Sequence, residues 1–313
     1  MTETRVAIVG AGALGCYFTA ILTRAGARVI LIARGRHLET VRRDGILLDD
    51  LERTHRVAPE GVTDRPADVG PVDAVVLAVK AWQVPEAAAQ IRPLVASGTR
   101  VLPLQNGIES WDELVRALGE EAPLMGLCRV ACALVAPGHV RHIAIVPTVV
   151  MGERDGAGLS GNAAALAAAL QSAGVVVENP ENMRVALWEK LIFIAGVSGA
   201  GAVARANVGE MRASAPTREL IRRIATEVRD VGRASGVPLA DDSVARVMAF
   251  VDSMAPASTA SMQRDIADGR PSELEAIIGA VVRLGAAAGI AAPATGFVYA
   301  SLLPQERRAR SGL

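Results

Sequence analysis

Two lysines are the first candidates for chemistry in this chain. Of its 33 basic residues, only Lys80 and Lys190 are lysines, and the others are arginines. A lysine amine can lose its proton when its surroundings lower its pKa, whereas a guanidinium stays charged. A site that must release a proton therefore has a chemical reason to keep lysine. We expect both lysines to lie near a functional site.

A glycine-rich string, Gly10-Ala11-Gly12-Ala13-Leu14-Gly15, fits the pattern G-x-G-x-x-G. It follows an apolar strand predicted at 5–9, opens a helix predicted at 13–25, and is followed by a strand predicted at 28–33. In that context the first glycine allows a tight turn and the second lets a pyrophosphate approach. The third lets helix and strand pack closely. The six residues are therefore predicted to bind a dinucleotide; the alternative is a glycine turn without a ligand.

The end of the second predicted strand indicates which dinucleotide. An acidic residue there would bind the ribose 2′-hydroxyl of NADH, and this segment carries none. It carries Arg34 and Arg36 instead, and a planar guanidinium suits a 2′-phosphate. The sequence therefore predicts NADPH as the cofactor. The alternative is that both arginines are solvated loop residues.

Polar residues follow the strands predicted at 73–79 and 100–104, where ligands of an open α/β sheet bind. Lys80, with Gln83 close behind it, is expected on the cofactor side; the alternative is a surface lysine with its stem along apolar atoms. Asn106 precedes a glycine in the next turn, and its amide could donate to a substrate oxygen or orient a nicotinamide. A plain turn asparagine is equally compatible with that spacing.

Lys190 lies in an apolar stretch, where a charge is costly unless it has a role. On a helix its face includes Leu187, Ile194 and Val197. Partial burial would lower the pKa of the amine toward neutrality, so that it could protonate the alkoxide formed when hydride attacks a ketone. The alternative is a structural lysine paired with an acid in a seam between domains.

The elements that must position these residues change in type along the chain. The first part alternates apolar strands with helices, which is typical of a buried parallel sheet. Further strands are predicted at 124–134, 148–151 and 175–177, with a helix at 163–172. Beyond an Asn- and Pro-containing break at 178–182 only helices are predicted, at 183–203, 218–235, 242–253, 273–288 and 294–302, followed by a frayed tail at 307–313.

We therefore expect an α/β protein whose Rossmann-type doubly wound parallel sheet, residues 1–181, binds NADPH. An all-α domain, residues 182–313, is expected to follow and to carry the substrate site. Lysine plus arginine equals aspartate plus glutamate at 33 each. This balance argues against a nucleic-acid or membrane-surface partner.

Three cysteines without zinc-site spacing are expected to be buried thiols in a reducing cytosol. No apolar run approaches the roughly 18 residues of a membrane span, and no secretory leader is visible. A cytoplasmic protein is therefore expected. The Ala-rich helices of the second part could bury a homodimer interface or only the domain core, and the sequence leaves both open.

Taken together, the motifs resemble the ketopantoate reductase (2-dehydropantoate 2-reductase) family, over residues Val6 to about Glu306. The resemblance is carried by GAGALG at 10–15, LIARG at 31–35, AVKAWQ at 78–83, LQNG at 104–107, APGHVRH at 136–142, LWEK at 187–190, SMQRDIADGRPSELEAIIG at 261–279 and GIAAPAT at 289–295.

The resemblance implies reduction of 2-dehydropantoate to pantoate with NADPH, a step toward pantothenate and coenzyme A, in a cleft between the two domains. It implies that Lys190 protonates the carbonyl oxygen and that Asn106 contacts substrate and cofactor. It further implies that Glu273 binds the substrate hydroxyl and that Ser261 lies at the carboxylate end. Arg34 and Lys80 match cofactor-side positions.

The sequence departs from the family at three substrate-side positions, where members commonly place asparagine. Here these are Ile194, Ser198 and Ser258. Each change removes an amide that could bond polar groups of a substrate, and Ile194 makes that wall apolar. A paralogue acting on a different 2-oxo acid, or a non-catalytic NADPH-binding module, is therefore the alternative to ketopantoate reduction.

Overall fold

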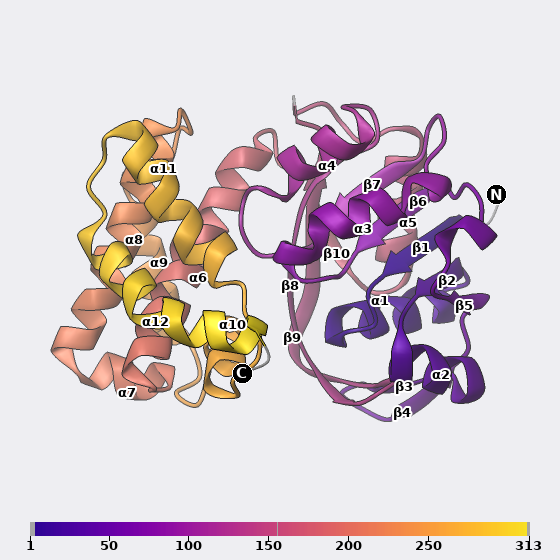
Figure 1. Ribbon diagram of the computed structural model, residues 1–313, viewed down its shortest axis with the longest axis horizontal. Helices are drawn as coiled ribbons and strands as arrows, with labels where there is room; N and C mark the ends of the chain where they lie inside the picture. The colour runs from indigo at the N-terminus through magenta and orange to yellow at the C-terminus, as the bar shows by residue number, and fades with distance from the viewer. Residues whose placement is uncertain (1–3, 155, 312–313) are drawn as a thin grey trace. The chain divides into compact units, whose positions relative to one another are not determined.

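The structure, a computed structural model, describes residues 4–154 and 156–311. Contacts within the chain divide it into two units (Figure 1). The first holds the described residues up to Gln105 together with Ser110–Met183. The second holds the segment Asn106–Glu109 and the described residues from Arg184 onward. Each unit is described by itself.

A five-stranded parallel sheet forms the centre of the first unit, in the order β5-β2-β1-β6-β7. Its strands are β1 (Arg5–Val9), β2 (Arg28–Ile32), β5 (Gly61–Thr63), β6 (Ala74–Leu77) and β7 (Arg100–Pro103). The chain starts at the central strand and winds outward in both directions, which makes the sheet doubly wound. The α/β fold and its parallel sheet are thus confirmed; the short edge strand β5 was not predicted.

Helices cover both faces of this sheet, which explains why its strands are apolar on both sides. Val6 and Ile8 of β1 belong to the same apolar cluster as Phe18 of α1. Ala7 and Val9 point the other way, into a second cluster with α3 and α4. The helices of this unit are α1 (Ala13–Arg24), α2 (Gly35–Asp44), α3 (Val84–Gln90), α4 (Ser110–Leu118) and α5 (Gly161–Ser172), with 3-10 turns at Pro66–Asp68, Ala81–Gln83 and Arg92–Leu94.

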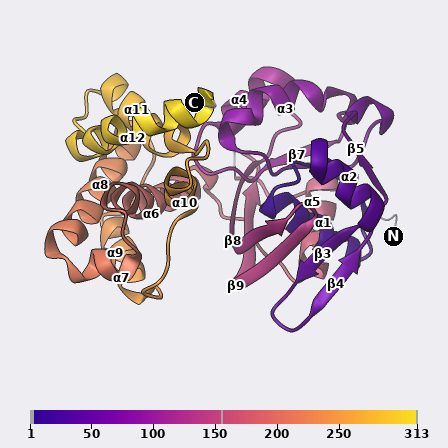
Figure 2. The same cartoon turned by 60° about the horizontal axis from the view of Figure 1, so that its bottom comes forward.

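A second, mixed sheet packs against α1. It consists of β3 (Ile46–Asp49), β4 (Thr54–Val57), β8 (Met125–Ala136), β9 (His139–Gly152) and β10 (Val176–Glu178). β9 pairs antiparallel with β8 and parallel with both β3 and β10. Figure 2 shows β8 and β9 running side by side as a long ribbon.

The strand predicted at 148–151 is much longer in the structure, where β9 begins at His139. Its first three residues, His139 to Arg141, include two polar side chains and pair with β3, which is distant in sequence. The short-range apolar pattern therefore detected only four residues near the end of this 14-residue strand.

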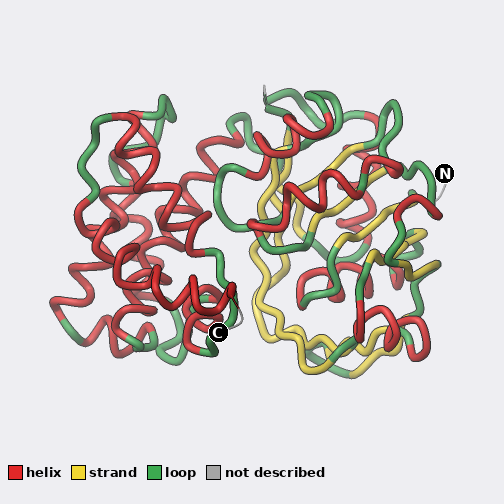
Figure 3. The backbone as a smooth tube through the Cα atoms, viewed as in Figure 1, coloured by secondary structure: helices red, strands yellow, loops and turns green. Residues whose placement is uncertain are grey.

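The second unit has no strand among its described residues (Figure 3). It consists of α6 (Met183–Ala204), α7 (Val208–Ala213), α8 (Ala215–Ala234), α9 (Ser243–Ser253), α10 (Ser261–Ala267), a π-helical turn (Glu275–Gly279), α11 (Ala280–Ala288) and α12 (Pro293–Ser311). The predicted all-α domain is confirmed. α6 is long and apolar enough to cross a membrane by composition alone, but 67% of its apolar window is buried, as in a core helix.

The frayed tail predicted at 307–313 is wrong for residues 307–311, which continue α12. Pro304 stands inside this helix, where its ring disfavours regular hydrogen bonding. The helix nevertheless continues to Ser311, and in its last turns Arg310 Nε donates at 2.6 Å to Glu306 Oε1, one turn earlier. Residues 312 and 313 lie outside the described part of the chain.

Candidate active site

The glycine-rich turn between β1 and α1 has the backbone that the motif predicts. Gly10 has φ +104°, and a Cβ there would lie 2.9 Å from Val79 Cγ1. A Cβ on Gly15 would lie 1.7 Å from the carbonyl oxygen of Gly10, so only glycine lets the helix approach the turn. Gly12, the N-cap of α1, has no atom within 4 Å of its missing Cβ.

The start of α1 suits an anionic ligand. No side chain caps it and its first turn carries no acidic residue, so its N–H groups and the positive end of the helix dipole face no competing carboxylate. Cys16 in the first turns is buried, and burial raises the pKa of its thiol to about 12. The residues present therefore fit a dinucleotide pyrophosphate.

We predict that Gly15→Ala and Gly12→Ala separate packing from ligand binding. Gly15→Ala should destabilise the protein by about 2–3 kcal/mol, because the added methyl overlaps backbone. Gly12→Ala should fold normally, since its φ of −72° suits alanine, yet weaken dinucleotide binding at least about ten-fold. Thermal unfolding and nucleotide titration of both variants test this. Unweakened binding by folded Gly12→Ala would contradict the assignment of the turn.

The cofactor-side residues follow β2 and β6, the two neighbours of β1. Arg34 is the N-cap of α2 and is exposed, with its Nη1 3.0 Å from Glu86 Oε1. Lys80 is half-buried in the turn after β6. The backbone N–H of Lys80 donates at 3.1 Å to Oε1 of Gln83, so this glutamine shapes the turn that carries the lysine.

Gln105, the neighbour of Asn106, was not among the predicted site residues, and the structure gives it a structural role. It is 5% exposed, and its Nε2 donates to the carbonyl oxygens of Leu77 at 2.8 Å and Val79 at 3.1 Å. Its amide therefore ties the end of β7 to the end of β6. In the sequence, the only sign of this role was a glutamine directly before Asn-Gly at the end of a predicted strand.

Asn106 and Glu273, 167 positions apart, are hydrogen-bonded to each other within the second unit. Asn106 Nδ2 donates to Glu273 Oε2 at 2.8 Å, and Glu273 is 5% exposed. Gly107 fixes this approach, because it has φ +106° and a Cβ there would lie 2.8 Å from the carbonyl oxygen of Ala276. Arg283 Nη2 donates to Glu109 Oε2 at 2.8 Å. The turn after β7 is thus held against the segment that carries Glu273.

The residue before Glu273, Ser272, belongs to a hydrogen-bonded cluster in which Ser272 and Glu306 are buried and the side chain of Arg310 is partly exposed. Ser272 donates from its N–H and its hydroxyl to the carboxylate of Glu306, with Oγ to Oε2 at 2.6 Å. Arg310 donates to Glu306 and also to the carbonyl oxygen of Ser272 at 3.0 Å. Glu306 is 2% exposed. Beyond Glu273 the helix begins with a π turn, a feature frequent at functional sites.

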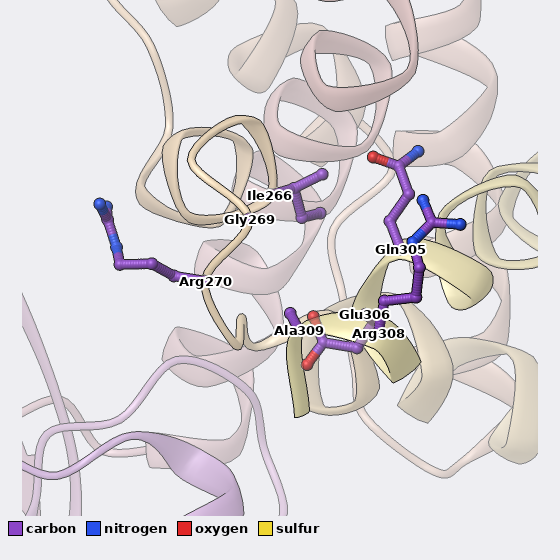
Figure 4. A pocket seen from close by; sticks show the side chains of 7 residues that line it. All are labelled: Ile266, Gly269, Arg270, Gln305, Glu306, Arg308 and Ala309. Atoms are coloured by element: carbon purple, nitrogen blue, oxygen red, sulfur yellow. The ribbon is translucent and has the colours of Figure 1, made fainter. Parts of the chain in front are cut away.

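A cavity of about 160 Å³ adjoins this cluster. Figure 4 shows Gln305 and Arg308 extending on one side of it and Arg270 pointing away. Arg270 instead pairs with Asp265 at 3.0 Å. The cavity is lined by Ile266, Gly269, Arg270, Gln305, Glu306, Arg308 and Ala309.

Lys190 lies on α6, half-buried on the face predicted for it. Leu187 and Val197 on this face are buried. Further along α6, a Cβ on Gly199 would lie 3.2 Å from Ile278 Cδ1, so the helix packs against the π turn. The helix of Lys190 and the segment of Glu273 therefore share one apolar core.

The remaining predicted substrate residues lie on α6 and on the segment leading to α10. Ile194 is half-buried, and its carbonyl oxygen accepts the hydroxyl of Ser198, which is buried. Ser258 is half-buried before α10, and Ser261 is the exposed first residue of that helix. α10 packs on α6, because Ser198 Oγ contacts Met262 Sδ at 3.9 Å. Their contact with substrate stays a prediction.

Among residues 4–154 and 156–311 no group of three or more His, Cys, Asp or Glu side chains is arranged to hold a metal ion. The three cysteines are free thiols.

A doubly wound sheet with this glycine turn, followed by an all-α domain, defines a Rossmann-type protein of two parts. Two family models narrow that class. The model described as ketopantoate reductase PanE/ApbA matches residues 6–156, and its C-terminal model matches residues 182–306. The chain belongs to the ketopantoate reductase family, whose members are oxidoreductases.

Curated relatives agree with this assignment at modest identity. A 2-dehydropantoate 2-reductase of Halobacterium salinarum is 30% identical over 290 residues, covering 92% of this chain and 94% of the relative. A 2-dehydropantoate 2-reductase of Nostoc sp. is 27% identical over 316 residues, covering 100% of this chain and 98% of the relative.

Solved structures share the whole fold. A PanE/ApbA family ketopantoate reductase from Ralstonia eutropha is 34% identical with a TM-score of 0.88, covering 98% of this chain and 99% of that one. A D-mandelate dehydrogenase solved with NADH and anilino(oxo)acetate has a TM-score of 0.87 at 24% identity, covering 98% and 99%. The latter similarity concerns the fold alone.

Proposed function

We propose that this protein is an NADPH-dependent reductase that converts 2-dehydropantoate to pantoate in pantothenate biosynthesis. Residues 1–181 would bind NADPH and residues 182–313 would carry the catalytic groups. The observation that carries the proposal is the hydrogen bond between Asn106 and Glu273. It joins two of the predicted catalytic residues in a chain whose relatives bear this activity in their names.

In the proposed reaction the bound cofactor supplies a hydride to the 2-oxo carbon. Lys190 donates a proton from Nζ to the carbonyl oxygen as negative charge develops on it. Asn106 donates from its amide near the reacting carbon, and Glu273 accepts from the substrate hydroxyl. Ser261 is assigned to the carboxylate end. The short bond between Asn106 and Glu273 keeps amide and carboxylate oriented before substrate arrives.

The proposed choice of NADPH rests on the residues that follow β2. Arg34 stands directly after that strand, and the segment from Ala33 to Arg36 has no acid that would select NADH. Lys80 and Gln83, after β6, are assigned to the same cofactor. The glycine turn suits the pyrophosphate because its glycines let β1 and α1 pack closely and because no side chain caps the N-terminus of α1.

One observation favours a second candidate, reduction of a more apolar 2-oxo acid. Ile194 follows Lys190 by one turn of α6 and is half-buried, so an apolar side chain lies next to the proposed proton donor. Ser198, one further turn along α6, donates its hydroxyl to the carbonyl oxygen of Ile194. Neither residue offers an amide to a polar substrate.

The experiment follows NADPH consumption with a panel of 2-oxo acids that includes 2-dehydropantoate and branched and aromatic 2-oxo acids. We expect the highest kcat/KM with 2-dehydropantoate. Preference for an apolar acid would establish the second candidate instead. Turnover of none of them would leave a non-catalytic NADPH-binding module.

A small-molecule 2-oxo acid is thus the proposed partner, with neither nucleic acid nor membrane. The cytoplasmic location stays a prediction. A homodimer likewise stays open.

A further inference from the structure

The ion pair between Arg34 and Glu86 lies beside the glycine turn. Arg34 follows β2 and Glu86 lies in the first turn of α3, which follows β6. β2 and β6 flank β1, the strand that leads into the turn. The pair, with Nη1 and Oε1 3.0 Å apart, therefore joins the segments that follow the two neighbours of β1.

The segment after β2 has no acidic residue, and Glu86 of α3 brings a carboxylate to Arg34 in that segment. In dinucleotide sites an acid at the end of the second strand accepts from the ribose 2′-hydroxyl of NADH. Here the acid comes from α3 instead, and it holds the guanidinium expected to bind the 2′-phosphate of NADPH. Among the described residues, Glu86 is the only acid paired with Arg34.

We propose that Glu86 determines cofactor preference by competing with the 2′-phosphate for Arg34. This inference rests on the proposed function, because it assumes that Arg34 faces the 2′ position. A 2′-phosphate of NADPH must approach a guanidinium whose Nη1 already pairs with a carboxylate, so it competes for that N–H group and is repelled by the nearby negative charge. Binding of NADH carries no such cost, since the carboxylate can accept from a 2′-hydroxyl. Glu86 thus weakens NADPH binding relative to NADH binding, so the protein prefers NADPH by a smaller factor than it would without Glu86.

The exposure of the pair sets the size of the effect. The side chains of Arg34 and Glu86 are 62% and 55% exposed, so water and salt screen their attraction. The pair can therefore open when a ligand arrives. Gln90 Nε2 also donates to Glu86 Oε1 at 3.0 Å, which keeps the carboxylate in place when Arg34 leaves.

The test is Glu86→Gln, with dissociation constants for NADPH and NADH measured by fluorescence titration of the full-length protein. We expect NADPH to bind about three- to ten-fold more tightly, the range of a screened charge acting on a phosphate. NADH should bind equally or more weakly. The gain for NADPH should shrink in 0.5 M salt, where screening is stronger.

Glu60→Gln is the matched control. Glu60 pairs with Arg28 at 2.8 Å, and Arg28 begins β2 whereas Arg34 follows its end. This variant removes the same charge from a carboxylate that pairs with Arg28 and, at 3.6 Å, with Arg5, at the opposite end of the sheet's strands. It should change neither dissociation constant by more than about two-fold, within the weak range of exposed pairs.

Arg34→Ala separates failure of this inference from failure of the proposed cofactor site. It should raise the dissociation constant of NADPH about ten-fold or more and change that of NADH by less than about two-fold, because only NADPH offers a 2′-phosphate to the guanidinium. If it does so while Glu86→Gln changes nothing, the role of Glu86 is refuted and the site stands. If Arg34→Ala affects both nucleotides equally, Arg34 does not face the 2′ position and both fail.

Discussion

Lys190→Ala is expected to lower kcat by roughly 10²–10⁴, the usual contribution of a general acid. Lys190 is one of only two lysines in the chain and is half-buried on an apolar face of α6. KM for the 2-oxo acid should change much less, because the lost proton transfer belongs to the transition state. Steady-state kinetics with NADPH and the best acid of the panel give both constants.

Lys190→Arg distinguishes chemistry from simple charge. A guanidinium keeps the positive charge but stays protonated, so kcat should remain low if Lys190 delivers the proton. Recovery with arginine would indicate a structural or electrostatic role. Glu189→Gln is the neighbouring control, since Glu189 pairs with Arg246 outside the proposed site. An unchanged kcat in Lys190→Ala would remove Lys190 from the mechanism.

Glu306→Ala is expected to destabilise the second unit by about 1–3 kcal/mol, the cost of leaving buried hydrogen-bond donors without their acceptor. Glu306 is 2% exposed and accepts from Ser272 and Arg310. Its loss leaves the buried N–H and hydroxyl of Ser272 without their acceptor, whereas the partly exposed guanidinium of Arg310 keeps its bond to the carbonyl oxygen of Ser272. Denaturant unfolding, followed for each transition separately, measures the change.

Two comparisons make the Glu306 prediction specific. Glu306→Ala combined with Arg310→Ala should cost less than the sum of the single changes, because each single change already removes the same ion pair. Glu219→Ala removes an exposed carboxylate bonded to Arg222 and Arg223, whose pairing lowers the pKa of Glu219 to about 2. Solvent screens that group, so its loss should hardly alter unfolding. Equal effects of Glu219→Ala and Glu306→Ala would contradict the prediction.

Loss of Glu306 should also reduce kcat/KM in protein that remains folded. Ser272 directly precedes Glu273, and Glu306 holds both the backbone N–H and the hydroxyl of Ser272. A loosened Ser272 displaces Glu273 and weakens its bond with Asn106. Activity measured well below the unfolding transition tests this positioning role.

The local sequence predicted those strands and helices whose apolar residues form a run or a regular repeat within a short segment. β1, β2, β6 and β7 are apolar on both faces because helices cover both sides of the sheet. The long helices α6 and α8 were likewise predicted to within a few residues. Only residues 148–151 of β9 were predicted, since its first residues are held by pairing with β3 rather than by an apolar sequence pattern of their own.

What the sequence by itself determined is the glycine turn, the apolar strands and the position of Lys190 on an apolar helix face. These depend on backbone sterics and on residues within one or two turns of each other. Tertiary structure alone decided that Asn106 meets Glu273, that Glu306 holds Ser272 and that Glu86 meets Arg34. Each of these contacts joins segments 34 to 167 residues apart. No local preference encodes such a pair, because its partner is chosen by how the whole chain packs.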